Sequence, residues 1–228
     1  MLLRAAFMPE SLRQSPTRAV TEFAEVFHFF ILRFVVFFTN ALIFVRLFRG
    51  EILEQTLHYA LLAPVSRRLL VAAKYIGGLV TALTLLVPAT VMTYLLVFLP
   101  HHDGLQLLLS TTTIRELVAY LWMVLLASLA YGALFLLAGL YFKNPMVPAV
   151  LFLGWEALTP FLPPLLKYLS FVHYLASFSP VPVRLRAFAL MAQPVPPWMA
   201  VLALLGATAG LVAAASWVAR RAGRGPKP

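Results

Sequence analysis

Residues 117–141 read LVAYLWMVLLASLAYGALFLLAGLY and contain no charged side chain. A helix needs about 20 mostly apolar residues to cross the hydrocarbon core of a bilayer. Four further stretches reach that length: residues 26–48, 76–99, 146–166 and 199–219. Only 11% of the 228 residues are charged, whereas a water-soluble domain has about 25%. The sequence therefore predicts a single all-α transmembrane domain, a polytopic bundle of about five to six spans.

Proline interrupts the stretch at 146–166, which contains Pro148, Pro160, Pro163 and Pro164. Proline removes a backbone donor and kinks or breaks a helix. Residues 165–198 are also rich in proline and in aromatic residues. Irregular backbone is tolerated at membrane depth only where protein or water covers it. We therefore expect 146–166 to be kinked or broken near its end, and 165–198 to be an external re-entrant or interfacial segment.

Basic side chains are distributed unequally between the two sets of loops. One set carries Arg46, Arg49, Arg67, Arg68, Lys74, Lys143, Arg220, Arg221, Arg224 and Lys227, and the other carries Arg115, Lys167, Arg184 and Arg186. Cytoplasmic loops carry the excess of Lys and Arg. The first set, with the tail 220–228, is therefore expected in the cytoplasm, and residues 1–25 as an external tail or surface helix. The net charge of +10 suits anionic lipid, so the partner is the bilayer and not nucleic acid.

Residues 50–74 read GEILEQTLHYALLAPVSRRLLVAAK. Four polar side chains recur there at helical spacing, on one face: Glu51, Glu54, Gln55 and His58. A segment this short and amphipathic is expected to lie along the cytoplasmic interface as a helix over 51–63. Lipid anchors usually present Lys or Arg to water, whereas this face is acidic, which favours a protein partner.

This segment resembles a motif of the permease subunits of type-2 ABC transporters, G-E-x-x-x-G-T-L-E-x-L-L-x-x-P-V-S-R followed by a lysine. The matching residues are Gly50, Glu51, Thr56, Leu57, Leu61, Pro64, Val65, Ser66, Arg67 and Lys74. Gln55 stands where the family often has glycine, and His58 where it often has glutamate. The resemblance implies a contact with a separate ATPase through Glu51, Glu54, Gln55, His58, Pro64 and Arg67.

The same resemblance implies how the chain works. It would be a permease subunit in a bacterial cytoplasmic (inner) membrane, exporting a substrate with an ATP-binding-cassette ATPase subunit that uses ATP and Mg. A second permease copy, identical or related, would complete the assembly, and this chain would bind no cofactor itself. The family usually has two spans before the motif, whereas one span precedes it here, so an upstream span is expected to be missing.

Two other functional classes stay open. A secondary transporter predicts more than one paired intramembrane charge and often internal repeats, and neither is found in the sequence. A membrane assembly protein without transport predicts that charge reversal in the acidic segment is neutral.

Arg33 and Glu156 are the charged residues placed inside the predicted spans. Such a charge costs roughly 2.5–3.5 kcal/mol on insertion scales, so both are candidates for a pathway or a protein-lined surface. Arg33 lies about two turns from the outer end of its predicted span, where a long side chain reaches the headgroups. Glu156 is expected to be neutral or to pair with Arg33.

Small residues at close helical spacing predict helix packing, within the bundle or at a subunit interface. They are Ser128, Gly132, Gly139, Gly206 and Gly210. Catalytic patterns are absent: the sequence has no His-Glu-x-x-His and no glycine-rich phosphate loop ending in Lys-Ser or Lys-Thr. We therefore expect no catalytic residue and no metal site, with ATP hydrolysed on another subunit.

Overall fold

The computed structural model describes residues 16–53, 67–99, 108–142, 144–181 and 195–222. All regular secondary structure within these ranges is helical. Four helices are long and apolar enough to cross a membrane: Ala19–Leu47, Arg68–Phe98, Thr111–Tyr141 and Pro197–Arg220. The predicted all-α polytopic bundle is confirmed, and the chain is an integral membrane protein.

The first long helix is built from three consecutive elements, α3 (Pro16–Val26), η1 (Phe27–Val36) and α4 (Phe37–Leu53). The element η1 is a π-helix, a wider form that is rare and often found at functional sites. The helix starts well before residue 26, and Phe23 is completely buried. The predicted tail or surface helix over 1–25 is therefore corrected for residues 16–25, which belong to the packed bundle.

The helix α8 (Thr111–Tyr141) is the centre of the bundle, and it contacts α4, α6 (Arg67–Phe98) and α12 (Pro197–Ala222). In its most apolar window 72% of the residues are buried, against 22% for α6 and for α12. Ser110 caps the start of α8 by accepting a hydrogen bond from the Thr113 backbone N–H. The outer faces of α6 and α12 are left to lipid or to another chain.

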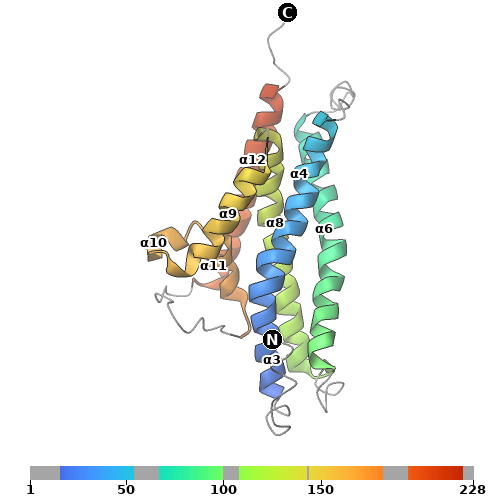
Figure 1. Ribbon diagram of the computed structural model, residues 1–228, viewed down its shortest axis with the longest axis vertical. Helices are drawn as coiled ribbons and strands as arrows, with labels where there is room; N and C mark the ends of the chain where they lie inside the picture. The colour runs from blue at the N-terminus through green and yellow to red at the C-terminus, as the bar shows by residue number, and fades with distance from the viewer. Residues whose placement is uncertain (1–15, 54–66, 100–107, 143, 182–194, 223–228) are drawn as a thin grey trace, which may run out of the picture.

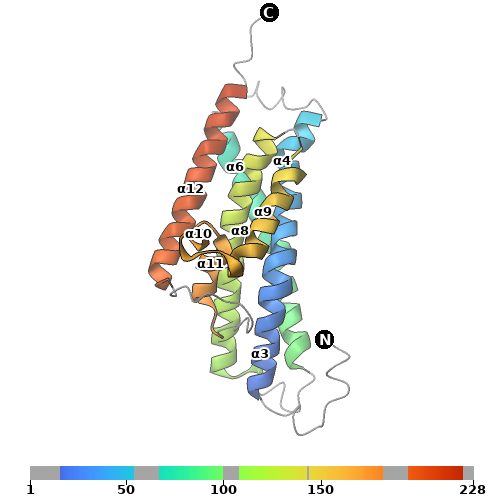
Figure 2. The same cartoon turned by 60° about the vertical axis from the view of Figure 1, so that its left-hand side comes forward.

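The stretch predicted as a span at 146–166 is not one continuous helix. The helix α9 (Met146–Leu158) has 13 residues, about 20 Å, whereas the hydrocarbon core is about 30 Å thick. Short turns follow it: η2 (Thr159–Phe161), α10 (Pro164–Lys167), α11 (Phe171–Leu175) and η3 (Ala176–Phe178). Figures 1 and 2 show α9 running from the end at which α8 finishes to the middle of the bundle, with α10 and α11 beside that middle.

The two ends of the bundle differ in which connections they hold (Figure 1). At one end α4 finishes and α6 begins, on either side of residues 54–66, and α8 and α12 also finish there. This end is named the coupling end. At the opposite end, named the distal end, α6 finishes and α8 begins.

Glycines let α4, α6 and α8 approach closely around the buried ring of Phe44. A Cβ atom on Gly132 would lie 2.6 Å from that ring, and one on Gly78 would lie 2.8 Å from it. A Cβ on Gly139 would lie 3.1 Å from the Val45 carbonyl oxygen. Because glycine has no side chain, α6 and α8 can approach the Phe44 ring closely at Gly78 and Gly132. A larger residue at either position would displace the ring.

Candidate functional site

The predicted ATPase contact falls mostly outside the described residues. Glu54, Gln55, His58 and Pro64 lie in the undescribed range 54–66. Glu51 lies in the last turn of α4, so the helix continues past Gly50 and the predicted helix over 51–63 does not begin as a separate element there. Arg67 is the first residue of α6. The contact itself stays a prediction.

The helices on either side of that range are joined by a polar contact at the coupling end. Lys74 Nζ donates a hydrogen bond to the Leu47 carbonyl oxygen at 2.7 Å, from the second turn of α6 to the last part of α4. Next to it, the Tyr75 hydroxyl donates to the Leu129 carbonyl oxygen of α8 at 2.8 Å. The start of α6 is therefore tied to both α4 and α8.

Glu156 has a structural role at the end of α9. Its side chain is 1% exposed and accepts three hydrogen bonds. The donors are the Ser170 hydroxyl at 2.6 Å, the Phe171 backbone N–H at 2.9 Å and the Val172 backbone N–H at 3.3 Å. These groups form the N-terminus of α11, which leaves backbone N–H groups in need of acceptors. Glu156 thus fastens the start of α11 to the end of α9.

Arg33 lies in the middle of its helix, and its predicted position near the outer end is wrong. It stands halfway along the span Ala19–Leu47, about 21 Å from either end, because the helix starts far upstream of residue 26. Its buried Nε has no hydrogen-bond partner within the described ranges. The π-helix η1, which carries Arg33, contacts α9, which carries Glu156.

A buried amide beside this region was missed by the sequence analysis. Asn40 is fully buried, and its Nδ2 donates to the Val36 carbonyl oxygen at 2.7 Å, at the last residue of the π-helix. The same nitrogen reaches Ser128 Oγ of α8 at 3.5 Å. The available signal was an uncharged polar residue inside an otherwise apolar run, about two turns from the nearest charged residues, Arg33 and Arg46. Ser128 thus lies at the α4–α8 contact through a polar pairing as well as through its small size.

Gly206 and Gly210 have a different environment from Gly132 and Gly139. Both are exposed on α12, and a Cβ atom on either would meet nothing within 4 Å. Gly132 and Gly139 of α8 therefore face α4, whereas Gly206 and Gly210 of α12 face outward.

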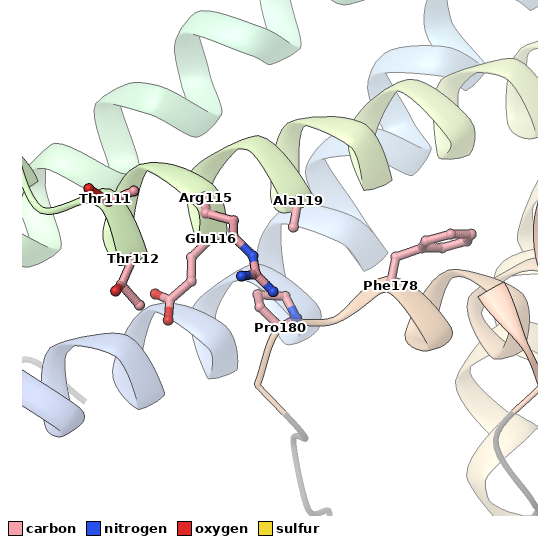
Figure 3. A pocket seen from close by; sticks show the side chains of 7 residues that line it. All are labelled: Thr111, Thr112, Arg115, Glu116, Ala119, Phe178 and Pro180. Atoms are coloured by element: carbon pink, nitrogen blue, oxygen red, sulfur yellow. The ribbon is translucent and has the colours of Figure 1, made fainter.

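A cavity of about 460 Å³ lies at the distal end, between the start of α8 and the segment after η3 (Figure 3). It is lined by Thr111, Thr112, Arg115, Glu116, Ala119, Phe178 and Pro180. Arg115 carries only a topology signal in the sequence, and no pattern relates it to Phe178, which is distant in the chain. Among the described residues, no three His, Asp or Glu side chains are grouped to hold a metal ion.

The family to which the chain belongs is decided by its first two thirds. The sequence pattern of the ABC-2 family transporter proteins matches residues 6–154. The chain belongs to the ABC-2 transporter family. The matched range contains α3, α4, α6, α8 and most of α9, together with the acidic segment between α4 and α6. No curated protein and no solved structure matches this ABC-2 family member.

Membership confirms the resemblance that the acidic segment suggested. An ABC-2 membrane protein is a component of a transport system.

Proposed function

We propose that this chain is the permease subunit of an ATP-driven exporter whose ATPase is a separate cytoplasmic subunit. The observation that carries the proposal is the ABC-2 family match over residues 6–154, which includes the acidic segment. The phosphate-loop pattern needed to bind ATP does not occur in the sequence. ATP and Mg are accordingly used by the partner, and this chain supplies the pathway for a substrate.

The coupling mechanism follows from the elements on either side of residues 54–66. A push by the ATPase on the segment 51–63 acts on α4 and α6 together, because Lys74 joins them at 2.7 Å. Tyr75 carries the displacement on to α8, the most buried helix. Closure of the ATPase then tilts these helices and switches access to the pathway between the two sides of the membrane.

The wider assembly belongs to the same proposal. Two permease copies and two ATPase subunits assemble in a bacterial cytoplasmic membrane, with the coupling end in the cytoplasm. The Lys and Arg excess at the loops of that end supports this orientation. Residues 159–181 then lead from the middle of the bundle to the external side, where Phe178 and Pro180 lie beside the start of α8.

The structure also bears on the ion-driven alternative. A secondary transporter needs an intramembrane carboxylate that is available to a coupling ion. The carboxyl group of Glu156 instead accepts three hydrogen bonds from residues 170–172. This engagement favours an external energy source over an ion gradient.

Co-expression tests the proposal. The tagged chain is produced with the ATP-binding-cassette subunit encoded beside it and purified in detergent, and the tagged chain alone serves as the control. We expect the ATPase subunit to co-purify, and ATP hydrolysis to occur in the complex and not in the chain alone. Robust ATPase activity of the stringently purified chain alone would exclude the permease assignment.

A further inference from the structure

The distal cavity places opposite charges beside an apolar wall. Arg115 is exposed and Glu116 is partly exposed, and both line the cavity together with two threonine hydroxyl groups. Ala119, Phe178 and Pro180 form the apolar part of the lining. Figure 3 shows the Arg115 guanidinium beside Pro180, with the Glu116 side chain projecting from the same helix. A volume of about 460 Å³ is within the usual range of small-ligand sites.

The position of the cavity along α8 corresponds to the depth of lipid headgroups. The helix has 31 residues and is about 46 Å long, whereas the hydrocarbon core is about 30 Å thick. When the excess length of the helix is divided equally between its two ends, about five residues lie outside the hydrocarbon core at each end. Arg115 is the fifth residue of α8, so its guanidinium lies at the boundary between headgroups and acyl chains.

The lining chemistry selects among lipids. A guanidinium and hydroxyl groups bind phosphate oxygens, and a carboxylate binds an ammonium group. An anionic lipid without an amine would meet Arg115 favourably and Glu116 unfavourably. A zwitterionic headgroup with a phosphate and a primary amine satisfies both charges, while Phe178 and Pro180 contact the start of its glycerol and acyl chains.

We propose that the distal cavity, with Arg115 and Glu116 on its wall, binds the headgroup of a zwitterionic aminophospholipid in the leaflet at that end. Arg115 binds the phosphate, and Glu116 binds the amine. The site is independent of which substrate the permease moves, and of whether an ATPase drives it.

The test is a lipid titration of the purified full-length chain followed by native mass spectrometry. The probes are phosphatidylethanolamine, phosphatidylglycerol and water-soluble phosphoethanolamine. We expect phosphatidylethanolamine to bind more tightly than the other two. Phosphoethanolamine distinguishes a membrane lipid from a free phosphate compound, because it has the same charged groups without acyl chains. If it bound as tightly as phosphatidylethanolamine, the assignment to a membrane lipid would be overturned.

Two substitutions separate the roles of the charges. Arg115→Gln should weaken phosphatidylethanolamine binding about tenfold through loss of a charged hydrogen bond, and it should weaken phosphatidylglycerol as well. Glu116→Gln should weaken phosphatidylethanolamine and strengthen phosphatidylglycerol, since it removes the repulsion. Arg115→Lys should recover part of the loss.

Arg68→Gln is the matched control, because Arg68 is an exposed arginine at the coupling end. It should leave binding of all three probes unchanged. Wild-type affinity for phosphatidylethanolamine in both Arg115→Gln and Glu116→Gln would overturn the proposal, and so would an equal loss in Arg68→Gln.

Discussion

The two halves of the bundle are held together by different means. On the side of α4, α6 and α8, the ring of Phe44 is fully buried between Gly78 and Gly132, and apolar surfaces pack directly. On the side of α9, α10 and α11, the buried carboxylate of Glu156 holds the turn through three hydrogen bonds. Apolar packing tolerates no added volume, whereas the polar arrangement depends on a single acceptor. The half next to the predicted ATPase contact is the densely packed one.

Glycine spacing illustrates the same difference. Gly132 and Gly139 on α8 lie against α4, but Gly206 and Gly210 on α12 face outward. In sequence both pairs are small residues in an apolar helix. Their consequences differ because dispersion contacts require a partner atom within reach. Gly132 and Gly139 have one on α4, whereas no residue of another described element lies within 4 Å of a Cβ atom on Gly206 or Gly210.

The largest effect is expected on the polar side. Glu156→Leu leaves the Ser170 hydroxyl and two backbone N–H groups without their acceptor in the protein interior. A buried donor left without an acceptor costs about 1–3 kcal/mol, so the loss of three should reach several kcal/mol. The measurement is the thermal unfolding midpoint of the detergent-solubilised protein, followed by size-exclusion chromatography.

Ser170→Ala serves as the partial control, because it removes one donor and leaves the two backbone bonds to Glu156. It should lower the midpoint by less than Glu156→Leu does. An unchanged midpoint in Glu156→Leu would show that the carboxylate does not hold the turn.

The next effect is expected on the packed side. Gly132→Leu forces a side chain into the position of the Phe44 ring, which Gly78 blocks from moving away. Overpacking of a filled core costs about 1–3 kcal/mol. Gly210→Leu is the matched control on α12 and should leave the unfolding midpoint unchanged. Equal effects of the two substitutions would remove the distinction between the two glycine pairs.

A smaller effect is expected at the coupling end. Lys74→Met removes the donor to the Leu47 carbonyl oxygen and should cost about 1–2 kcal/mol of stability. Lys74→Arg keeps a charged donor and should retain most of it. The same unfolding assay measures both variants, and identical midpoints for Met and Arg would show that the hydrogen bond between α6 and α4 contributes little.

Much of the fold is predictable from hydropathy, since a run such as 117–141 has few alternatives to a membrane span. The apolar window of the first span begins only after Glu22 and Glu25, although Phe23 between them packs in the bundle. The helix itself begins at Pro16, and proline is favoured at the first position of a helix. The break after α9 was predicted, because proline chemistry is local.

The sites were less predictable than the spans. Glu156 is recognisable in the sequence as an intramembrane charge. Its hydrogen-bond donors belong to residues 170–172, and only the folded structure shows that these residues lie beside it. The cavity brings Arg115 together with Phe178, and no local pattern connects them. Asn40 gave only a weak signal, because one amide hardly changes the hydropathy of an apolar run.

The central claim is that the acidic segment between α4 and α6 receives force from a separate ATPase. Glu51→Lys combined with Glu54→Lys changes two units of charge at each position, four in all, and should oppose a complementary patch on the partner. Glu25→Lys, an exposed acid on the first helix near the distal end, is the control.

The deciding measurement is co-purification of the ATPase subunit with the tagged double variant from membranes. We expect the variant to accumulate in the membrane at the wild-type level but to lose the ATPase subunit, while Glu25→Lys retains it. Normal complex formation and normal ATP hydrolysis in the double variant would contradict the claim and leave the acidic segment as a plain connector between two spans.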